Sequence, residues 1–255
     1  MTLRILIGTT LFLIFIACVY FGGFFFLLLV FIFTAIALQE FIKLAVPGNK
    51  PGIFITSILL FTIALILKSQ GGLTALFLFQ LLTVFLIPLF SLFLIGQDKV
   101  PYAGIWLFGY LYLSIPAIFG VLIREYGMEF VLLPVLTVVV YDTVAFFMGR
   151  RFGRHPLAPK LSPSKTIEGM ISGWVFALIF SLLFPKVPTQ LKVLNGIFIP
   201  LCAQIGDLIE SGIKRYYRVK DSPRILGPHG GFLDRVDSIY FSVPFFYLIL
   251  LIVGG

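Results

Sequence analysis

Residues 5–38 read ILIGTTLFLIFIACVYFGGFFFLLLVFIFTAIAL, an almost unbroken apolar run. A bilayer core of ~30 Å needs roughly 20 apolar residues in a helix, so this run is too long for a single crossing. Gly22-Gly23 interrupts it near the middle and favours a tight hairpin between two membrane-spanning helices. The run therefore predicts a fold built from membrane helices.

The rest of the chain has the same character. Of its 255 residues, 60% are hydrophobic and 12% are charged, whereas a soluble domain is nearer one quarter charged. Cutting the chain at glycines, prolines and charge clusters predicts nine spans, at about 5–21, 24–45, 53–68, 72–96, 103–123, 128–149, 169–185, 191–213 and 237–253. We therefore expect an all-α polytopic membrane protein that forms one integral membrane domain, residues 1–255, with N-terminal helices in 1–130 and candidate catalytic helices and cytoplasmic loops in 131–255.

Lysine and arginine in short loops predict the orientation of the chain. With the N-terminus inside, nine spans place 15 of the 19 basic residues on the inner side and 4 on the outer side. This predicts a cytoplasmic N-terminus and puts both long polar loops, 150–168 and 214–236, on the cytoplasmic face. The net charge of +8 is explained by loops next to anionic headgroups, and with no basic soluble module we expect no nucleic-acid partner.

Residues 206–238, GDLIESGIKRYYRVKDSPRILGPHGGFLDRVDS, hold the densest set of charges, with five of the 11 acidic and six of the 19 basic residues. Mixed charge at the edge of a bilayer is costly to desolvate and usually marks a functional site. Asp207, Glu210, Ser211 and Lys214 are spaced to share one helix face. Metal ligation by Asp207, with Glu210, is the functional interpretation, and an interhelical salt bridge is the alternative.

Asp234 and Asp237 form a second acidic pair, three residues apart, at the start of the last predicted span. Helix capping alone would explain Asp237. The two pairs lie on helices joined by one loop, so Asp207 and Asp234 are predicted to share Mg²⁺ with phosphate oxygens. Between them, residues 227–231 (GPHGG) predict a turn whose backbone N–H groups approach phosphate. His229 is left open as a general acid, a phosphate donor or a loop residue.

The other polar loop contributes cations. Ser164-Lys165-Thr166 enters the seventh predicted span, so Ser164 or Thr166 is expected to cap that helix, and free N–H groups at a helix N-terminus bind phosphate. Topology-setting charge is the alternative for the arginines of this loop. Asp142 lies ~12 Å from Arg150 along a helix and is a candidate for the same site. Near the predicted span ends, four acids are expected to be solvated: Glu40, Asp98, Glu125 and Glu129.

The segment from Ser211 to Asp237 resembles the signature of phosphatidate cytidylyltransferases, also called CDP-diacylglycerol synthases. The matching positions are Ser211, Lys214, Arg215, Lys220, Asp221, His229, Gly230, Gly231, Asp234, Arg235 and Asp237. Upstream, Asp142, residues 149–154, residues 162–169 and Gly206-Asp207 are also similar to that family. Two departures are Pro223, where a small residue is usual, and Ser164, where a second lysine is common.

The resemblance implies transfer of a cytidylyl group from CTP to phosphatidate with Mg²⁺, at the cytoplasmic face of a bacterial inner membrane, by a homodimer; it leaves a second cation open. It makes Asp207 and Asp234 the leading metal ligands, with Asp142, Glu210 and Asp237 in support. Catalytic roles fall to Asp207, Asp234, Lys214, His229 and Asp142. Substrate contacts are expected from Lys165, Ser164, Thr166, Arg215, Lys220, Asp221, Gly230, Gly231 and Arg235.

Three alternative functions could use the same residues. A CTP-dependent polyprenol or phytol kinase would share the membrane, CTP and metal, but would transfer the γ-phosphoryl group. A CDP-archaeol synthase would run the same chemistry on an ether lipid. A transporter could use intramembrane acids as ion ligands, but it would need polar residues through the full depth of the membrane, and the polar residues here gather at one face.

Overall fold

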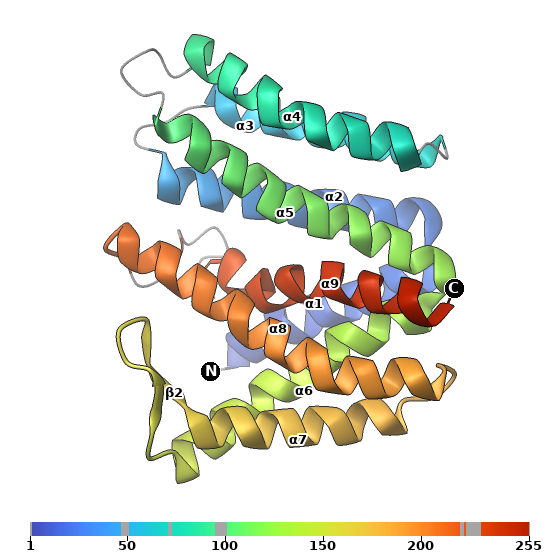
Figure 1. Ribbon diagram of the computed structural model, residues 1–255, viewed down its shortest axis with the longest axis vertical. Coiled ribbons are helices and arrows are strands. Elements are labelled where there is room, and N and C mark those ends of the chain that lie inside the picture. The colour runs from blue at the N-terminus through green and yellow to red at the C-terminus, as the bar shows by residue number, and fades with distance from the viewer. Residues whose placement is uncertain are drawn as a thin grey trace. The chain divides into compact units, whose positions relative to one another are not determined.

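The computed structural model describes residues 2–46, 51–70, 73–94, 101–219, 222 and 231–254. Within them, the chain forms nine helices and two short strands (Figure 1). Their bounds are α1 (Thr2–Phe21), α2 (Gly23–Ala45), α3 (Pro51–Ser69), α4 (Leu73–Leu94), α5 (Pro101–Tyr126), α6 (Met128–Phe152), β1 (Pro156–Ala158), β2 (Ser162–Thr166), α7 (Ile167–Leu183), α8 (Thr189–Tyr216) and α9 (Leu233–Gly254).

Seven of these helices are long and apolar enough to cross a membrane: α2, α3, α4, α5, α6, α8 and α9. Helix α7 and the Gly8–Phe21 part of α1 are shorter apolar helices. The prediction of a helical integral membrane protein is confirmed. That all nine helices cross the membrane, and that the N-terminus is cytoplasmic, stay predictions.

The break at Gly22-Gly23 is where the first two helices meet. Gly22 has φ 64° and Gly23 φ 45°, backbone conformations that glycine adopts without steric cost. Arg124, in the last turn of α5, donates from Nε to the Val19 carbonyl at 2.8 Å, which satisfies a carbonyl at the end of α1 that has no partner within the helix. The predicted break between the first two helices is therefore confirmed, and it is built on two left-handed glycines.

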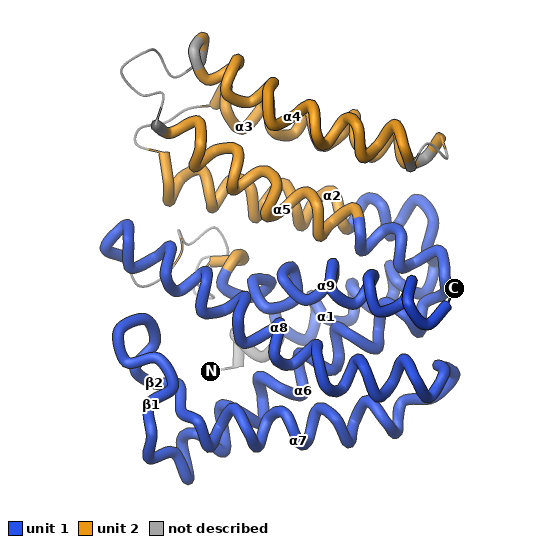
Figure 2. The backbone as a smooth tube through the Cα atoms, in the orientation of Figure 1, with its two compact units in different colours: residues 1–29, 119–220, 234–255 blue, residues 30–118, 221–233 orange. Residues whose placement is uncertain are grey.

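The described chain divides into two compact units (Figure 2). The first comprises residues 1–29, 119–220 and 234–255, and the second comprises residues 30–118 and 221–233. The strands and helices α6, α7 and α8 belong to the first unit, together with almost all of α9, while α3 and α4 belong to the second. Every acidic side chain predicted to bind metal lies in the first unit.

Within the first unit, α6 packs against α7, and α7 packs against α8 (Figure 1). A Cβ on Gly173 would lie 2.8 Å from the Tyr141 carbonyl oxygen, and one on Gly169 would lie 2.6 Å from that of Ala145. Only glycine permits so close an approach of two backbones, as is common between membrane helices.

A buried hydrogen-bond network joins the same three helices. The Asn195 side chain on α8 donates to Thr137 Oγ1 on α6 at 2.8 Å and to Ser181 Oγ on α7 at 2.9 Å. Tyr141 Oη on α6 donates to Gln204 Oε1 on α8 at 2.8 Å. Polar side chains in a bilayer are stabilised by such partners, so α8 is held in register with α6 and α7 along the stretch that leads to Asp207.

The polar loop predicted at 150–168 contains a small antiparallel hairpin. Pro156 of β1 pairs with Thr166 of β2, and Ala158 pairs with Ser162. Thr166 then caps α7, because its side chain accepts the Gly169 N–H at 3.2 Å. The expected cap is confirmed at Thr166. The hairpin itself is not apparent from the sequence, which has no hydrophobic alternation there.

Candidate active site

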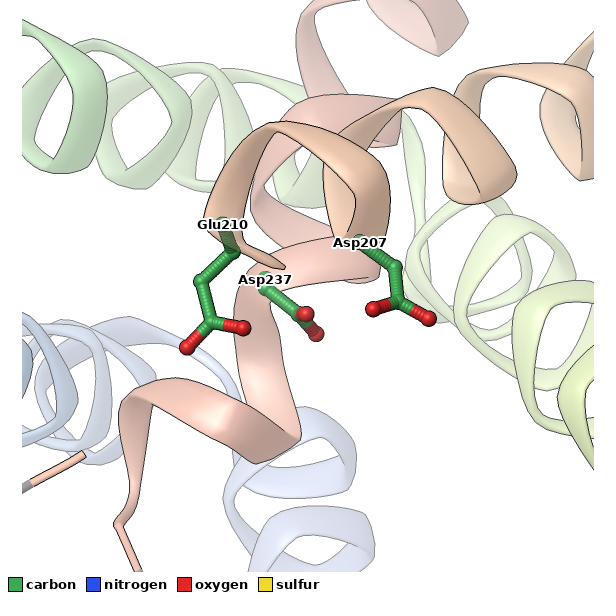
Figure 3. A group of neighbouring side chains, drawn as sticks. All are labelled: Asp207, Glu210 and Asp237. Atoms are coloured by element: carbon green, nitrogen blue, oxygen red, sulfur yellow. The ribbon is translucent and has the colours of Figure 1, made fainter. Parts of the chain in front are cut away.

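Three carboxylates meet where α9 crosses α8 in the first unit (Figure 3). Asp207 and Glu210 project from α8, and Asp237 projects from α9 toward them. One oxygen of each lies within 4.8 Å of the others, so the group could hold a metal ion. Glu210 and Asp237 are only 1% and 6% exposed. Three buried or half-buried acids repel one another unless cations neutralise them.

Lys165 supplies one of those cations. It is the residue of β2 just before the α7 cap, and its Nζ contacts Asp207 Oδ2. Burial lowers the pKa of Lys165, and the nearby charge of Asp142, followed by that of Asp237, opposes this effect and favours the ammonium form. The contact joins residues far apart in the chain, and it supports the predicted place of Lys165 beside the carboxylates.

Lys214 supplies the second cation and joins α8 to α9. Its Nζ lies 2.6 Å from Glu210 Oε2, one turn back on α8, and 3.1 Å from Asp234 Oδ1 on α9. The Lys214 side chain is only 12% exposed. Asp234 is therefore linked through Lys214 to Glu210, a member of the three-carboxylate group. Asp234 itself is not a member of that group, whose α9 carboxylate is Asp237. The interhelical salt bridge that the sequence left as an alternative therefore exists, and it lies beside the three carboxylates that could hold a metal ion.

Asp142 lies on α6, and its negative charge favours the ammonium form of Lys165. The Asp142 side chain is exposed. It is not one of the three carboxylates that gather in the described residues, and its supporting role stays a prediction.

Two side chains, Arg215 and Glu168, hold the β-hairpin that carries Lys165. Arg215, near the end of α8, donates from Nε to the Leu161 carbonyl at 3.2 Å. Glu168 Oε1 lies 2.5 Å from His155 Nδ1, while its Oε2 accepts the Arg154 N–H at 3.1 Å. Arg215 was predicted to face phosphate. In the structure its guanidinium donates to the backbone carbonyls of Leu161 and Val219, and the first of these bonds anchors the hairpin.

The Glu168 carboxylate gives a pH prediction. The hydrogen bond from His155, followed by that from the Arg154 N–H, lowers the pKa of Glu168 from 4.5 to about 2. A depressed pKa contributes stability that is present above the unfolded value and is lost as the pH falls toward the folded value. Between about pH 5 and 8, the wild-type hairpin is therefore expected to keep this contribution in full.

Glu168→Gln should loosen the hairpin throughout that pH range, because the wild-type carboxylate stays ionised there. The measurement is hydrogen exchange of residues 154–168, comparing the two proteins at each pH. Glu129→Gln, which removes an acid from the first turn of α6, is the matched control and should leave these amides unchanged. Hairpin amides that exchange alike in the two proteins at every pH of the range would contradict the assignment.

Glu40 differs from its expected solvated state. It is 0% exposed, and its two oxygens accept the N–H groups of Phe232 at 2.8 Å and Leu233 at 2.7 Å. Helix α9 accordingly begins at Leu233, earlier than the predicted 237, because these N–H groups have an acceptor that local sequence cannot reveal. Sequence reasoning missed this residue, and its one available signal was a carboxylate inside an apolar span.

The remaining predicted site residues have varied surroundings. Ser164 is exposed on β2, and Arg235 is exposed on α9. Gly231 is buried, and Ser211 donates to Asp207 Oδ1 at 3.4 Å. Outside the described residues lie Asp98, Lys220, Asp221, Pro223, His229 and Gly230. For these, the predictions stand as made.

Comparison with known proteins identifies the family of the chain. Residues 2–253 match the model of the family described as the cytidylyltransferase family. The chain is 32% identical over 260 residues to the phosphatidate cytidylyltransferase of Staphylococcus haemolyticus, covering 98% of this chain and 99% of that protein. It is 31% identical over 264 residues to that of Staphylococcus epidermidis, with the same coverage. The Bacillus subtilis enzyme is 38% identical over 131 residues, or 49% of each chain.

This match covers the helices of both units. It also covers the charged segment, residues 206–238. The site residues from Asp142 to Asp237 all fall within it. The chain therefore belongs to the cytidylyltransferase family, as its signature residues predicted.

Proposed function

We propose that this protein transfers the cytidylyl group of CTP to phosphatidate, giving CDP-diacylglycerol and pyrophosphate for phospholipid biosynthesis. The observation that carries the proposal is the meeting of Asp207, Glu210 and Asp237 with two lysines, Lys165 and Lys214, in one unit of a membrane protein. Family membership and relatives named phosphatidate cytidylyltransferase support it.

The reaction joins two anions, which explains the composition of the site. A phosphate oxygen of the lipid attacks the α-phosphorus of CTP, a new P–O bond forms, and the bond to the β-phosphate oxygen breaks. The electron pair leaves with pyrophosphate. Such a reaction is accelerated mainly by positioning and by charge stabilisation. Phosphatidate is already nucleophilic, so the site needs cations and metal ligands more than a strong base.

The four acids of the network would hold Mg²⁺: Asp207, Glu210, Asp234 and Asp237. Carboxylates together with substrate phosphates are the usual ligands of this hard cation. When bound, Mg²⁺ supplies charge neutralisation on the triphosphate. A second cation would fit the same set, because Asp234 shares Lys214 with Glu210 rather than lying in the three-carboxylate group.

The two lysines provide cations that can reach phosphate. Lys165 lies just before the N-terminus of α7, where free N–H groups also favour anions. Lys214 is fixed between two acids on different helices. In the proposed reaction, both stabilise negative charge that develops on the leaving pyrophosphate. The remaining substrate contacts are expected from Ser164, Thr166, Arg235 and the GPHGG segment at 227–231.

The proposed orientation puts the site at the cytoplasmic face of a bacterial inner membrane, where CTP is available. The support is the distribution of basic residues, 15 of 19 on one predicted side, and the bacterial source of the relatives. The homodimer implied by the family resemblance belongs to the same proposal.

The decisive experiment uses purified protein in detergent with phosphatidate, Mg²⁺ and CTP labelled at the α-phosphate in one reaction and at the γ-phosphate in another. We expect α-label in the lipid and γ-label in pyrophosphate. A kinase would instead leave α-label in CDP and place γ-label in the lipid, which would overturn the proposal. An ether-linked phosphatidate analogue, used in parallel, tests the CDP-archaeol alternative.

A further inference from the structure

Glu40 uses both carboxylate oxygens to hold consecutive peptide groups. Oε1 accepts the Phe232 N–H at 2.8 Å and Oε2 accepts the Leu233 N–H at 2.7 Å. All three residues belong to the second unit. A buried carboxylate is stable only where it is hydrogen-bonded or paired, and N–H groups at the start of a helix are favourable partners for it.

These two bonds set the first turn of α9. Two acceptors on one rigid carboxylate fix both the position and the direction of the peptide groups that they hold. Leu233 is the first residue of α9, Asp234 follows it directly, and Asp237 lies one turn further on. The helix that carries Asp234 and Asp237 therefore begins at the two peptide groups that Glu40 binds.

The chain around this contact is closely packed. A Cβ on Gly231 would lie 2.4 Å from Ser222 Cβ and 3.1 Å from Glu40 Oε2. The Phe232 ring packs edge-on against Phe33, with ring centroids 4.8 Å apart. Gly231 thus lets the chain approach Glu40, which gives this glycine a role distinct from the phosphate contact predicted for it.

We infer that Glu40 is a positioning residue for the carboxylates of α9, acting through the two N–H groups that it accepts. The inference rests on the proposed function, since it gives a purpose to the placement of Asp234 and Asp237. Errors of about 1 Å in a site of this kind cost about 100-fold in rate. Glu40 itself touches neither substrate nor metal in this assignment.

The test compares Glu40→Gln, Glu40→Asp and Glu40→Ala with wild type. Glutamine keeps the shape but replaces one acceptor with an amide that cannot accept a hydrogen bond. We expect the rate of cytidylyl transfer to fall about 10- to 100-fold, and the affinity for Mn²⁺, measured alone by electron paramagnetic resonance, to weaken about 10-fold. Aspartate, which keeps the charge on a shorter stem, should recover part of both. Glu129→Gln is the control and should change neither.

The outcomes separate this inference from the proposed function. If wild type transfers no label to lipid, the proposed function fails, while Mn²⁺ binding still tests Glu40. If wild type is active and folded Glu40→Gln matches it in rate and in Mn²⁺ affinity, the positioning role is wrong. Loss of folding in all three variants would also overturn the inference, because Glu40 would then serve the fold as a whole.

Discussion

Asp207→Asn is expected to lower cytidylyl transfer by about 10²- to 10³-fold, the loss typical of removing one preorganised charge from a water-poor site. Asparagine keeps the shape but removes a charge that Lys165 contacts and that lies within 4.8 Å of Glu210 and Asp237. The measurement is the initial rate with α-labelled CTP over a range of Mg²⁺ concentrations.

Glu125→Gln is the matched control for Asp207→Asn. Glu125 is an exposed acid near the end of α5 in the same unit, so its loss should leave the rate unchanged. Thermal unfolding in detergent checks that Asp207→Asn is folded. A folded variant with near wild-type turnover at every Mg²⁺ concentration would remove Asp207 from the proposed metal site.

The same assay compares Asp234 with Asp237. Sequence reasoning favoured Asp234 as the partner of Asp207, whereas the geometric group contains Asp237. If both bind metal, as proposed, Asp234→Asn and Asp237→Asn each lower the rate strongly and raise the Mg²⁺ concentration needed for half-maximal activity. A variant that keeps the wild-type Mg²⁺ dependence removes its aspartate from the proposed metal site.

Lys214→Met should have the largest effect on stability, about 3 kcal/mol or more, because it leaves acids without their cation in a largely buried place. Lys214 lies 2.6 Å from Glu210 and 3.1 Å from Asp234, and so joins α8 to α9. We expect a lower unfolding temperature in detergent together with loss of cytidylyl transfer. Lys192→Met, which removes a lysine from the other end of α8, should change neither.

A double variant sharpens the Lys214 test. Adding Glu210→Gln to Lys214→Met removes one of the buried charges left behind, so part of the lost stability should return while activity should not. Coupling of this kind between contacting residues is typically 0.5–3 kcal/mol, roughly. If Lys214→Met unfolds at the wild-type temperature, the bridge contributes nothing measurable and the interpretation of Lys214 as an interhelical link is wrong.

Hydropathy located every helix because the free energy of transfer into a bilayer is summed over a short local window. Each of the nine predicted spans has a helix in the described residues, and the Gly22-Gly23 break falls between α1 and α2. The signature residues indicated the family for a similar reason, since their types and spacing can be read directly. The start of α9 was predicted four residues too late, at 237 instead of Leu233. The N–H groups at the true start are bound by Glu40, which is distant in sequence.

What the sequence determined by itself was therefore local: an integral membrane protein, the approximate limits of its helices, and a family whose chemistry needs carboxylates and cations. The tertiary structure alone decided which of those groups meet. It put Lys165 against Asp207 by way of a small hairpin, Asp237 with Asp207 and Glu210, and Lys214 against Asp234. It also buried Glu40 at 0% exposure. Such pairings depend on how helices far apart in the chain pack, and a local window contains no information about that packing.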